Sequence, residues 1–149
     1  MLILIAAHLL NPFMALSHIP DVIGAFIAGF NLTPTGVLVL ILAIYIVLGC
    51  FLEGFAMLVL TLPIFFPVIT SYGIDPIFFG VLCVLALEMG LISPPVGLNV
   101  FIVKSVAPKV ELGRIFVGVA PFWVMMLLTL TILIAFPQLA LFLPNTMID

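Results

Sequence analysis

The sequence predicts an all-α integral membrane protein, built from spanning helices together with one re-entrant helical hairpin and one discontinuous helix. Of the 149 residues, 66% are hydrophobic and only 6% are charged, and the mean hydropathy is +1.59. Such a composition excludes a soluble globular domain and indicates several helices in lipid. A span needs about 20 apolar residues, so the chain has room for a handful of spans and little else. We therefore expect a single membrane domain over residues 1–149. The net charge of −3 offers no basic surface for a nucleic acid, so membrane lipid is the expected environment.

The first two segments are predicted to be a span and a short surface helix. Residues 1–16 are apolar, and no Lys or Arg precedes them, whereas a signal peptide needs a positive start. A spanning helix is therefore expected there. Residues 20–31 carry Pro20 and Asp21 at their start, followed by apolar residues at helical spacing. This pattern is typical of a short helix lying in the membrane interface.

The segment 35–70 is predicted to be a re-entrant hairpin. It is too long for one span and is interrupted only at residues 49–54, where glycines flank Glu53. The two arms, of roughly 14 and 16 residues, reach only about 21 and 24 Å, short of the ~30 Å hydrocarbon core. The alternative is a pair of ordinary short spans joined by a tight loop. Arm length and the polar tip favour a hairpin whose tip stops inside the membrane.

The next helix, residues 76–107, is predicted to break near its centre. Pro94 and Pro95 have no backbone N–H, so the carbonyls of Gly90 and Leu91 lose their helical partners. Free carbonyls at the end of one half-helix suit a small cation, and free N–H groups at the start of the next suit an anion such as a carboxylate. Unwound backbone at membrane depth is tolerated where it is buried in protein or lines a cavity, as in secondary transporters. The alternative is a spanning helix with a simple proline kink.

The chain is predicted to end in a final span over residues 115–136 and an external tail over 137–149. All three basic residues, Lys104, Lys109 and Arg114, lie in the loop before this span. The positive-inside rule places that loop in the cytoplasm. Counting along the chain, the hairpin then opens to the outside and the C-terminus is external.

Five short motifs occur in order along the chain. They are Gly49-x-x-x-Glu53, Pro63-Ile64-x-x-Pro67, Gly73-Ile74-Asp75-Pro76-x-x-x-Gly80-Val81, Gly90-Leu91-Ile92-Ser93-Pro94-Pro95-Val96-Gly97 and Pro121-Phe122. In this order and spacing they resemble the large membrane subunit of TRAP transporters, the DctM-like family. The resemblance extends over nearly the whole chain and is weakest before Thr33.

The resemblance implies the second inverted repeat of an elevator-type ion transporter, which is the C-terminal part of a permease. Such a permease is a multi-pass protein of the bacterial inner (cytoplasmic) membrane and imports organic acids with sodium as the coupling ion. Its expected partners are an extracytoplasmic substrate-binding protein, a small TRAP membrane subunit and the remaining N-terminal half of the permease. A single repeat supplies only half of a transport site, so we expect this chain to be a fragment or the product of a split gene.

In that family, the hairpin tip and the unwound loop together form half of the ion and substrate site. Carried over to this sequence, the substrate-binding candidates are Ser93, Pro94, Pro95, Val96, Gly97 and Asn99. The candidate ligands of the cation are Gly49, Glu53, Gly90, Leu91 and Ser93. Ser93 stands where the family usually has Thr, and Glu53 where it often has Asp.

A different function class remains open from the residues alone. Glu53 and Glu88 are carboxylates within apolar segments, where each costs roughly 2.5 kcal/mol or more on insertion scales. They could serve a proton-conducting or assembly subunit of a larger membrane complex. The chain carries no Gly-x-Ser-x-Gly and no His-Glu-x-x-His motif, so neither an enzyme nor a cofactor other than sodium is expected.

Overall fold

The structure, a computed structural model, describes residues 12–13, 16–29 and 32–147. The span predicted over residues 1–16 lies largely outside these residues. Every regular element in the described part is a helix. The helices are α2 (Ile19–Ala28), α3 (Pro34–Gly49), α4 (Gly54–Ser71), α5 (Pro76–Ile92), α6 (Leu98–Val106), α7 (Leu112–Ala135) and α8 (Gln138–Met147).

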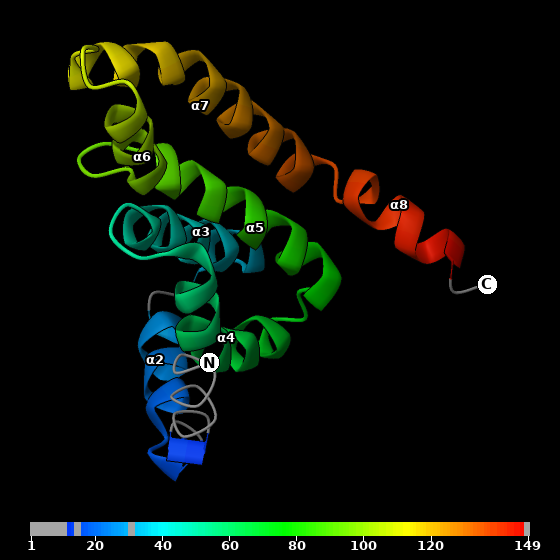
Figure 1. Cartoon of the computed structure of the whole chain (residues 1–149). Coiled ribbons are helices and arrows are strands. Elements are labelled where there is room, and N and C mark those ends of the chain that lie inside the picture. The colour runs from blue at the N-terminus through cyan, green and yellow to red at the C-terminus, as the bar shows by residue number, and fades with distance from the viewer. Residues whose placement is uncertain (1–11, 14–15, 30–31, 148–149) are drawn as a thin grey trace.

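Helix α5 is the centre of the fold (Figure 1). Its most extensive partner is α3, while α7 runs along another side and α4 makes a smaller contact. The buried residues of α3 recur every three or four positions, as on one face of a helix, and they pack on a similar face of α5. Tyr45, Phe79 and Leu82 are among the fully buried side chains of this core. The two arms of the hairpin therefore meet less with each other than with the helix that follows them.

Local sequence signals set where these helices begin. The Thr33 side chain accepts a hydrogen bond from the Gly36 N–H, and Pro34 takes the first position of α3. Asp75 accepts hydrogen bonds from the first-turn N–H groups of α5, with Pro76 as the first helical residue. Both arrangements combine an N-cap with a proline whose missing N–H is not needed there.

Two helices are long and apolar enough to cross a membrane, namely α4 with 18 residues and α7 with 24. Helix α7 has only Ile115 and Leu130 buried, and large apolar side chains such as Val117 (73% exposed) and Phe122 (68% exposed) cover its outer face. A water-soluble protein would not leave an apolar face of this extent uncovered. The exposed face is what a helix in contact with lipid or another membrane subunit requires.

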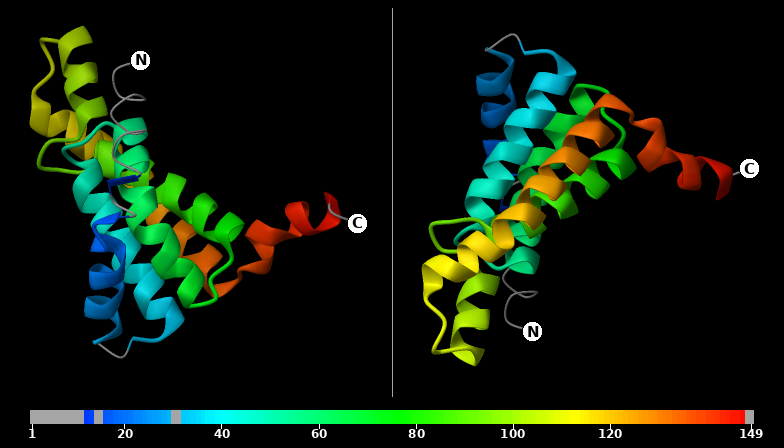
Figure 2. Two further views of the ribbon diagram at one scale, coloured as in Figure 1. Left: turned by 90° about the horizontal axis from the view of Figure 1, so that it is seen from below. Right: turned by 90° about the horizontal axis from the view of Figure 1, so that it is seen from above.

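The hairpin turn and the break between α5 and α6 lie side by side, and α6 continues past the turn (Figure 2). Helices α3 and α4 have 16 and 18 residues, two more each than the sequence predicts, and so reach about 24 and 27 Å. Pro63 and Pro67 lie inside α4. The chain between Ile92 and Leu98 is not helical, as expected from the paired prolines.

Candidate functional site

The hairpin tip meets the end of α5 through two glycines. A Cβ placed on Gly90 would lie 2.7 Å from the Gly49 Cα and 2.8 Å from the Ile46 carbonyl oxygen. A Cβ placed on Gly49 would lie 3.0 Å from the Gly90 Cα. The two backbones are therefore in direct contact, closer than any residue with a side chain would permit. This crossing fixes the hairpin tip beside the break in the following helix.

The break itself rearranges the hydrogen bonds of the last turn of α5. The Gly90 carbonyl accepts the Ser93 N–H at 3.0 Å, three residues on, in place of the bond that a continuing helix would give it. Pro94 and Pro95 have no N–H to offer, and within the described part of the chain no N–H reaches the Leu91 carbonyl. The peptide bond between the prolines is cis. Leu91 therefore presents an open backbone oxygen, while one lone pair of the Gly90 oxygen is already used.

Ser93 has a defined hydrogen-bonding environment and is only 4% exposed. Its Oγ lies 2.6 Å from the Met89 carbonyl oxygen and 2.7 Å from Nε1 of Trp123, which comes from α7. The contact with Trp123 could not be predicted from local sequence patterns, because 30 residues separate the two partners. The single tryptophan of the chain, placed inside an apolar span, was the only available signal.

Helix α6 begins without a side-chain cap. Gly97 is its N-cap residue, with φ +57°, and the helix starts at Leu98. The Gly97 carbonyl accepts the Val100 N–H at 2.8 Å, whereas the N–H groups of Val96 to Asn99 have no acceptor among the described residues. Free N–H groups at a helix start attract negative charge. Free N–H groups at the start of the second half-helix were expected from the sequence, and Val96, Gly97 and Asn99 were among its substrate-binding candidates.

The hairpin tip touches the broken segment a second time through Cys50. Its sulfur lies 3.7 Å from the Pro94 carbonyl oxygen and 3.3 Å from the Ile46 carbonyl oxygen. A thiol is a weak hydrogen-bond donor, so these contacts add little to the stability of the loop. Glu53, three residues on, faces its own helix: one carboxylate oxygen accepts the Phe55 N–H and the other accepts the Ala56 N–H, each at 3.0 Å.

A groove of about 430 Å³ runs between the start of α4, the second half of α5 and the start of α6. Its polar side chains are Glu53, Glu88 and Asn99, and the rest of its lining is apolar or glycine. Glu88 is exposed and makes no hydrogen bond or ion pair with the described residues. The groove therefore brings both carboxylates that stood out in the sequence to one surface, together with the first turn of α6.

The predicted cation ligands are only partly brought together. Gly49, Gly90, Leu91 and Ser93 lie around the glycine crossing, whereas the Glu53 carboxylate turns toward its own helix and caps the start of α4. Across the described residues, no three His, Cys, Asp or Glu side chains gather to hold a metal. A cation bound here would depend on backbone carbonyls and a hydroxyl, ligands suited to a hard ion.

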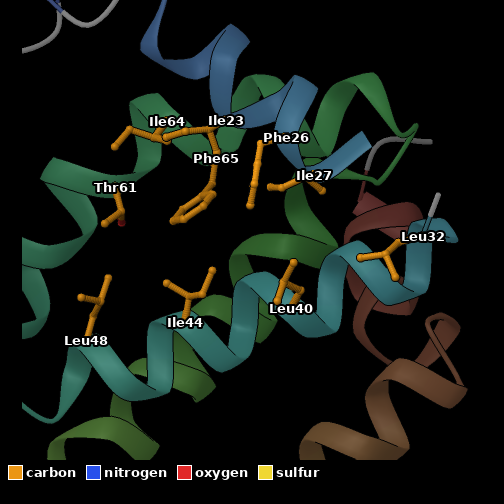
Figure 3. Close-up of a pocket in the computed structure, with 10 residues that line it drawn as sticks. All are labelled: Ile23, Phe26, Ile27, Leu32, Leu40, Ile44, Leu48, Thr61, Ile64 and Phe65. Atoms are coloured by element: carbon orange, nitrogen blue, oxygen red, sulfur yellow. The ribbon is translucent and has the colours of Figure 1, made fainter. Parts of the chain in front are cut away.

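A second cavity lies away from this region, between α2, α3 and α4 (Figure 3). It measures about 520 Å³, and among the described residues that line it Thr61 is the one polar residue. The Thr61 and Tyr45 hydroxyls lie 2.7 Å apart and join the two arms of the hairpin. Because the remaining lining is hydrophobic, this cavity offers no groups to orient a polar substrate. The remaining lining residues are Ile23, Phe26, Ile27, Leu32, Leu40, Ile44, Leu48, Ile64 and Phe65.

The amino-acid sequence is similar to a family of transporter permeases. The family model "Tripartite ATP-independent periplasmic transporter, DctM component" matches residues 1–139. The C4-dicarboxylate TRAP transporter large permease protein DctM of Pseudomonas aeruginosa is 35% identical over 146 residues, which cover 97% of this chain and 34% of that protein. The sialic acid TRAP transporter permease protein SiaT of Haemophilus influenzae is 36% identical, over 78% of this chain and 19% of its own length.

A third relative has a different substrate in its name. The ectoine TRAP transporter large permease protein TeaC of Halomonas elongata is 32% identical, over 87% of this chain and 30% of its own length. The chain thus spans about a third or less of the length of these relatives.

Proposed function

The chain belongs to the DctM component family of tripartite ATP-independent periplasmic transporters, and from this premise we propose that it forms one half of the ion and substrate site of a sodium-coupled permease. The family is membrane-bound and is not a family of enzymes. The proposed cargo is an organic acid. The proposed location is the bacterial cytoplasmic membrane, which the chain crosses several times.

The observation that carries the proposal is the meeting of four helix ends at one place. The ends of α3 and α5 touch at Gly49 and Gly90, while α4 and α6 start beside them and share the groove. Helix C-termini carry partial negative charge and N-termini partial positive charge. Unwound backbone between such ends forms ion and substrate sites in secondary transporters.

The negative helix C-termini and the positive helix N-termini suit different ligands. Around the ends of α3 and α5, the open Leu91 carbonyl and Ser93 offer oxygen ligands to sodium. At the start of α6, the uncapped N–H groups of Leu98 and Asn99 offer donors to a carboxylate. The start of α4 offers less to an anion, because Glu53 already occupies two of its N–H groups.

In the membrane, we take α3 and α4 as a re-entrant hairpin and α5 with α6 as one discontinuous spanning helix. Helix α3, at about 24 Å, falls short of the ~30 Å hydrocarbon core, while α4, with 18 residues and about 27 Å, is near the lower limit for a span. The passage of α6 beyond the hairpin tip supports the same arrangement (Figure 2). Together these elements correspond to one inverted repeat of an elevator-type transporter, with α2 lying along the interface.

Partners complete the proposed site. We expect an extracytoplasmic binding protein to deliver the substrate and a small membrane subunit to accompany the permease, since the relatives are named as large permeases of TRAP systems. The rest of the permease supplies the other half of the site. Glu88 supports the presence of such a partner. Its carboxylate is exposed on an apolar helix and has no ion pair among the described residues, so in a membrane it needs a counter-group or a polar cavity.

The proposal is tested by closing the break. Replacing Pro94 and Pro95 with alanine returns an N–H to each position, so that the carbonyls of Gly90 and Leu91 regain helical partners. Alanine also favours the helix by about 3 kcal/mol per position relative to proline. Sodium-driven uptake by the complete permease, with its partners supplied in proteoliposomes, should be lost while the chain still inserts. Unchanged sodium dependence would reduce the loop to a kink and overturn the assignment.

A proton-conducting role through Glu53 and Glu88 receives less support. The two side chains share the groove, yet both oxygens of Glu53 accept backbone N–H groups in α4. A carboxylate that caps a helix is stabilised in its charged form and is poorly suited to carry protons. Glu53 is therefore poorly placed to take part in a proton path.

A further inference from the structure

We propose that Trp123 positions the Ser93 hydroxyl so that this group can serve the coupling cation and cannot donate to the substrate. The inference rests on the proposed function and deepens it. It assigns a role to a residue of α7, outside both the hairpin and the broken helix. It also separates two roles that the sequence left joined at Ser93, which is a candidate for both the ion and the substrate.

The chemistry of the three partners fixes the direction of each hydrogen bond. An indole nitrogen can only donate, so Ser93 Oγ must accept from Trp123 Nε1 across their 2.7 Å separation. A carbonyl can only accept, so the single hydroxyl proton must point to the Met89 oxygen at 2.6 Å. No choice of hydrogen positions is left open. The Ser93 oxygen then keeps one lone pair and has no proton to give.

The remaining lone pair of Ser93 Oγ can bind a cation but cannot bind a carboxylate. A carboxylate has only acceptor oxygens, so Ser93 in this state has nothing to offer it. A sodium ion, in contrast, is bound by oxygen lone pairs, such as those of the Leu91 carbonyl and the Ser93 hydroxyl two residues on. The substrate carboxylate is left to the N–H groups at the start of α6. Ser93 is buried, so water cannot readily replace either partner.

The surroundings of Trp123 hold it in this role. The indole also lines a cavity of about 270 Å³ beside Ile92 and Pro94, and nearly all of that lining is apolar. Turned toward this cavity, the indole N–H would lose its hydrogen bond, which makes the Ser93 oxygen its favoured acceptor. Because α7 also packs on α5 and α6, the contact ties the unwound loop to a continuous spanning helix.

The test compares two substitutions of Trp123 by smaller aromatic rings. Trp123→Phe deletes the donor, whereas Trp123→His keeps a ring N–H that can point to Ser93. The complete permease is used, with its partner subunits. Trp123→Phe should raise the sodium concentration for half-maximal uptake by about two- to tenfold, the range that one neutral hydrogen bond supports. Substrate KM measured at saturating sodium should stay unchanged, and Trp123→His should recover part of the sodium affinity.

A second readout does not depend on transport. Sodium added without substrate should raise the thermal midpoint of the purified wild-type permease, relative to an equal concentration of choline, because binding to the folded state stabilises it. The increment should shrink in Trp123→Phe and in Ser93→Ala. As a control, Phe122→Leu alters an exposed aromatic side chain on the same helix and should leave the increment intact.

The outcomes separate this inference from the proposed function. Wild-type sodium affinity in both Trp123→Phe and Ser93→Ala would overturn the role of Trp123 while sodium-coupled transport stands. Equal loss in the Phe and His variants would reduce Trp123 to packing. A raised substrate KM at saturating sodium in Ser93→Ala would show that the hydroxyl serves the substrate. Failure of the complete wild-type permease to take up substrate with sodium would instead defeat the proposed function.

Discussion

Adding one methyl group at Gly90 is the sharpest test of the site's construction. In Gly90→Ala the new Cβ would lie 2.7 Å from the Gly49 Cα and 2.8 Å from the Ile46 oxygen. Carbon atoms in ordinary contact are about 3.5–4.0 Å apart, so α3 and α5 must separate by about 1 Å. Each neighbouring atom belongs to backbone, so no side chain can rotate away to relieve the clash.

The energetic cost can be isolated by a matched substitution on the same helix. Overpacking in a close-packed region costs about 1–3 kcal/mol, while replacing glycine by alanine inside a helix gains about 1 kcal/mol. Gly80 also lies in α5 and has no atom within 4 Å of an added Cβ. Gly80→Ala should therefore show only the gain in helix propensity. The difference in unfolding free energy between Gly90→Ala and Gly80→Ala then measures the cost of the clash between the two backbones.

The functional effect should exceed the change in stability. A displacement of about 1 Å at a site that positions ligands can cost roughly a hundredfold in rate. Sodium-dependent uptake by the complete permease should therefore nearly vanish in Gly90→Ala and persist in Gly80→Ala. Gly49→Ala, whose nearest contact would be 3.0 Å, should be intermediate. If Gly90→Ala matched Gly80→Ala in thermal midpoint and uptake, the two backbones would not be in contact and the reasoning would be refuted.

Further predictions concern the loop, the hairpin cap and the topology. Gly97→Ala places a side chain at φ +57° and only 3.0 Å from the backbone carbonyl oxygen of Ser93, so the thermal midpoint should fall. An unchanged midpoint would contradict the left-handed N-cap. Glu53→Ala should cost about 1 kcal/mol of unfolding free energy through loss of the α4 cap, and Glu53→Asp should recover most of it; equal losses would argue against capping. In a cysteine-free background, Lys109→Cys should resist an impermeant thiol reagent added from outside, and labelling from that side would reverse the topology. Leu52→Cys should resist the same reagent added to inverted vesicles, since we place the hairpin tip within the membrane; ready labelling would favour two full spans.

The sequence was sufficient to locate the break and the hairpin turn, because both follow from residues that act locally. Paired prolines remove N–H groups wherever they stand, and Asp75 before Pro76 begins a helix by local hydrogen bonds. The distribution of hydrogen bonds after the break was harder to foresee. The Gly90 carbonyl regains a donor three residues on, whereas the Leu91 carbonyl does not, and this difference depends on the loop conformation.

Contacts between distant residues could not be read from the chain. Gly49 and Gly90 were both candidate cation ligands, but their direct contact depends on the register in which α3 packs on α5, and the apolar faces of the two helices do not set that register. The link from Trp123 to Ser93 likewise depends on how α7 lies against the break. Glu53 illustrates the opposite case: a carboxylate expected near a cation is engaged by N–H groups two and three residues ahead.

The glycine crossing also limits how the site can open. Separating α3 from α5 at Gly49 and Gly90 would give up the direct packing contact between the two backbones. Sliding one helix along the other would drive a neighbouring side chain into the same narrow gap. The hairpin tip and the broken helix must therefore travel as one rigid body. If the chain forms half of a transport site, as we propose, access to the ion would then alternate at the outer boundary of this body, where it meets the rest of the permease.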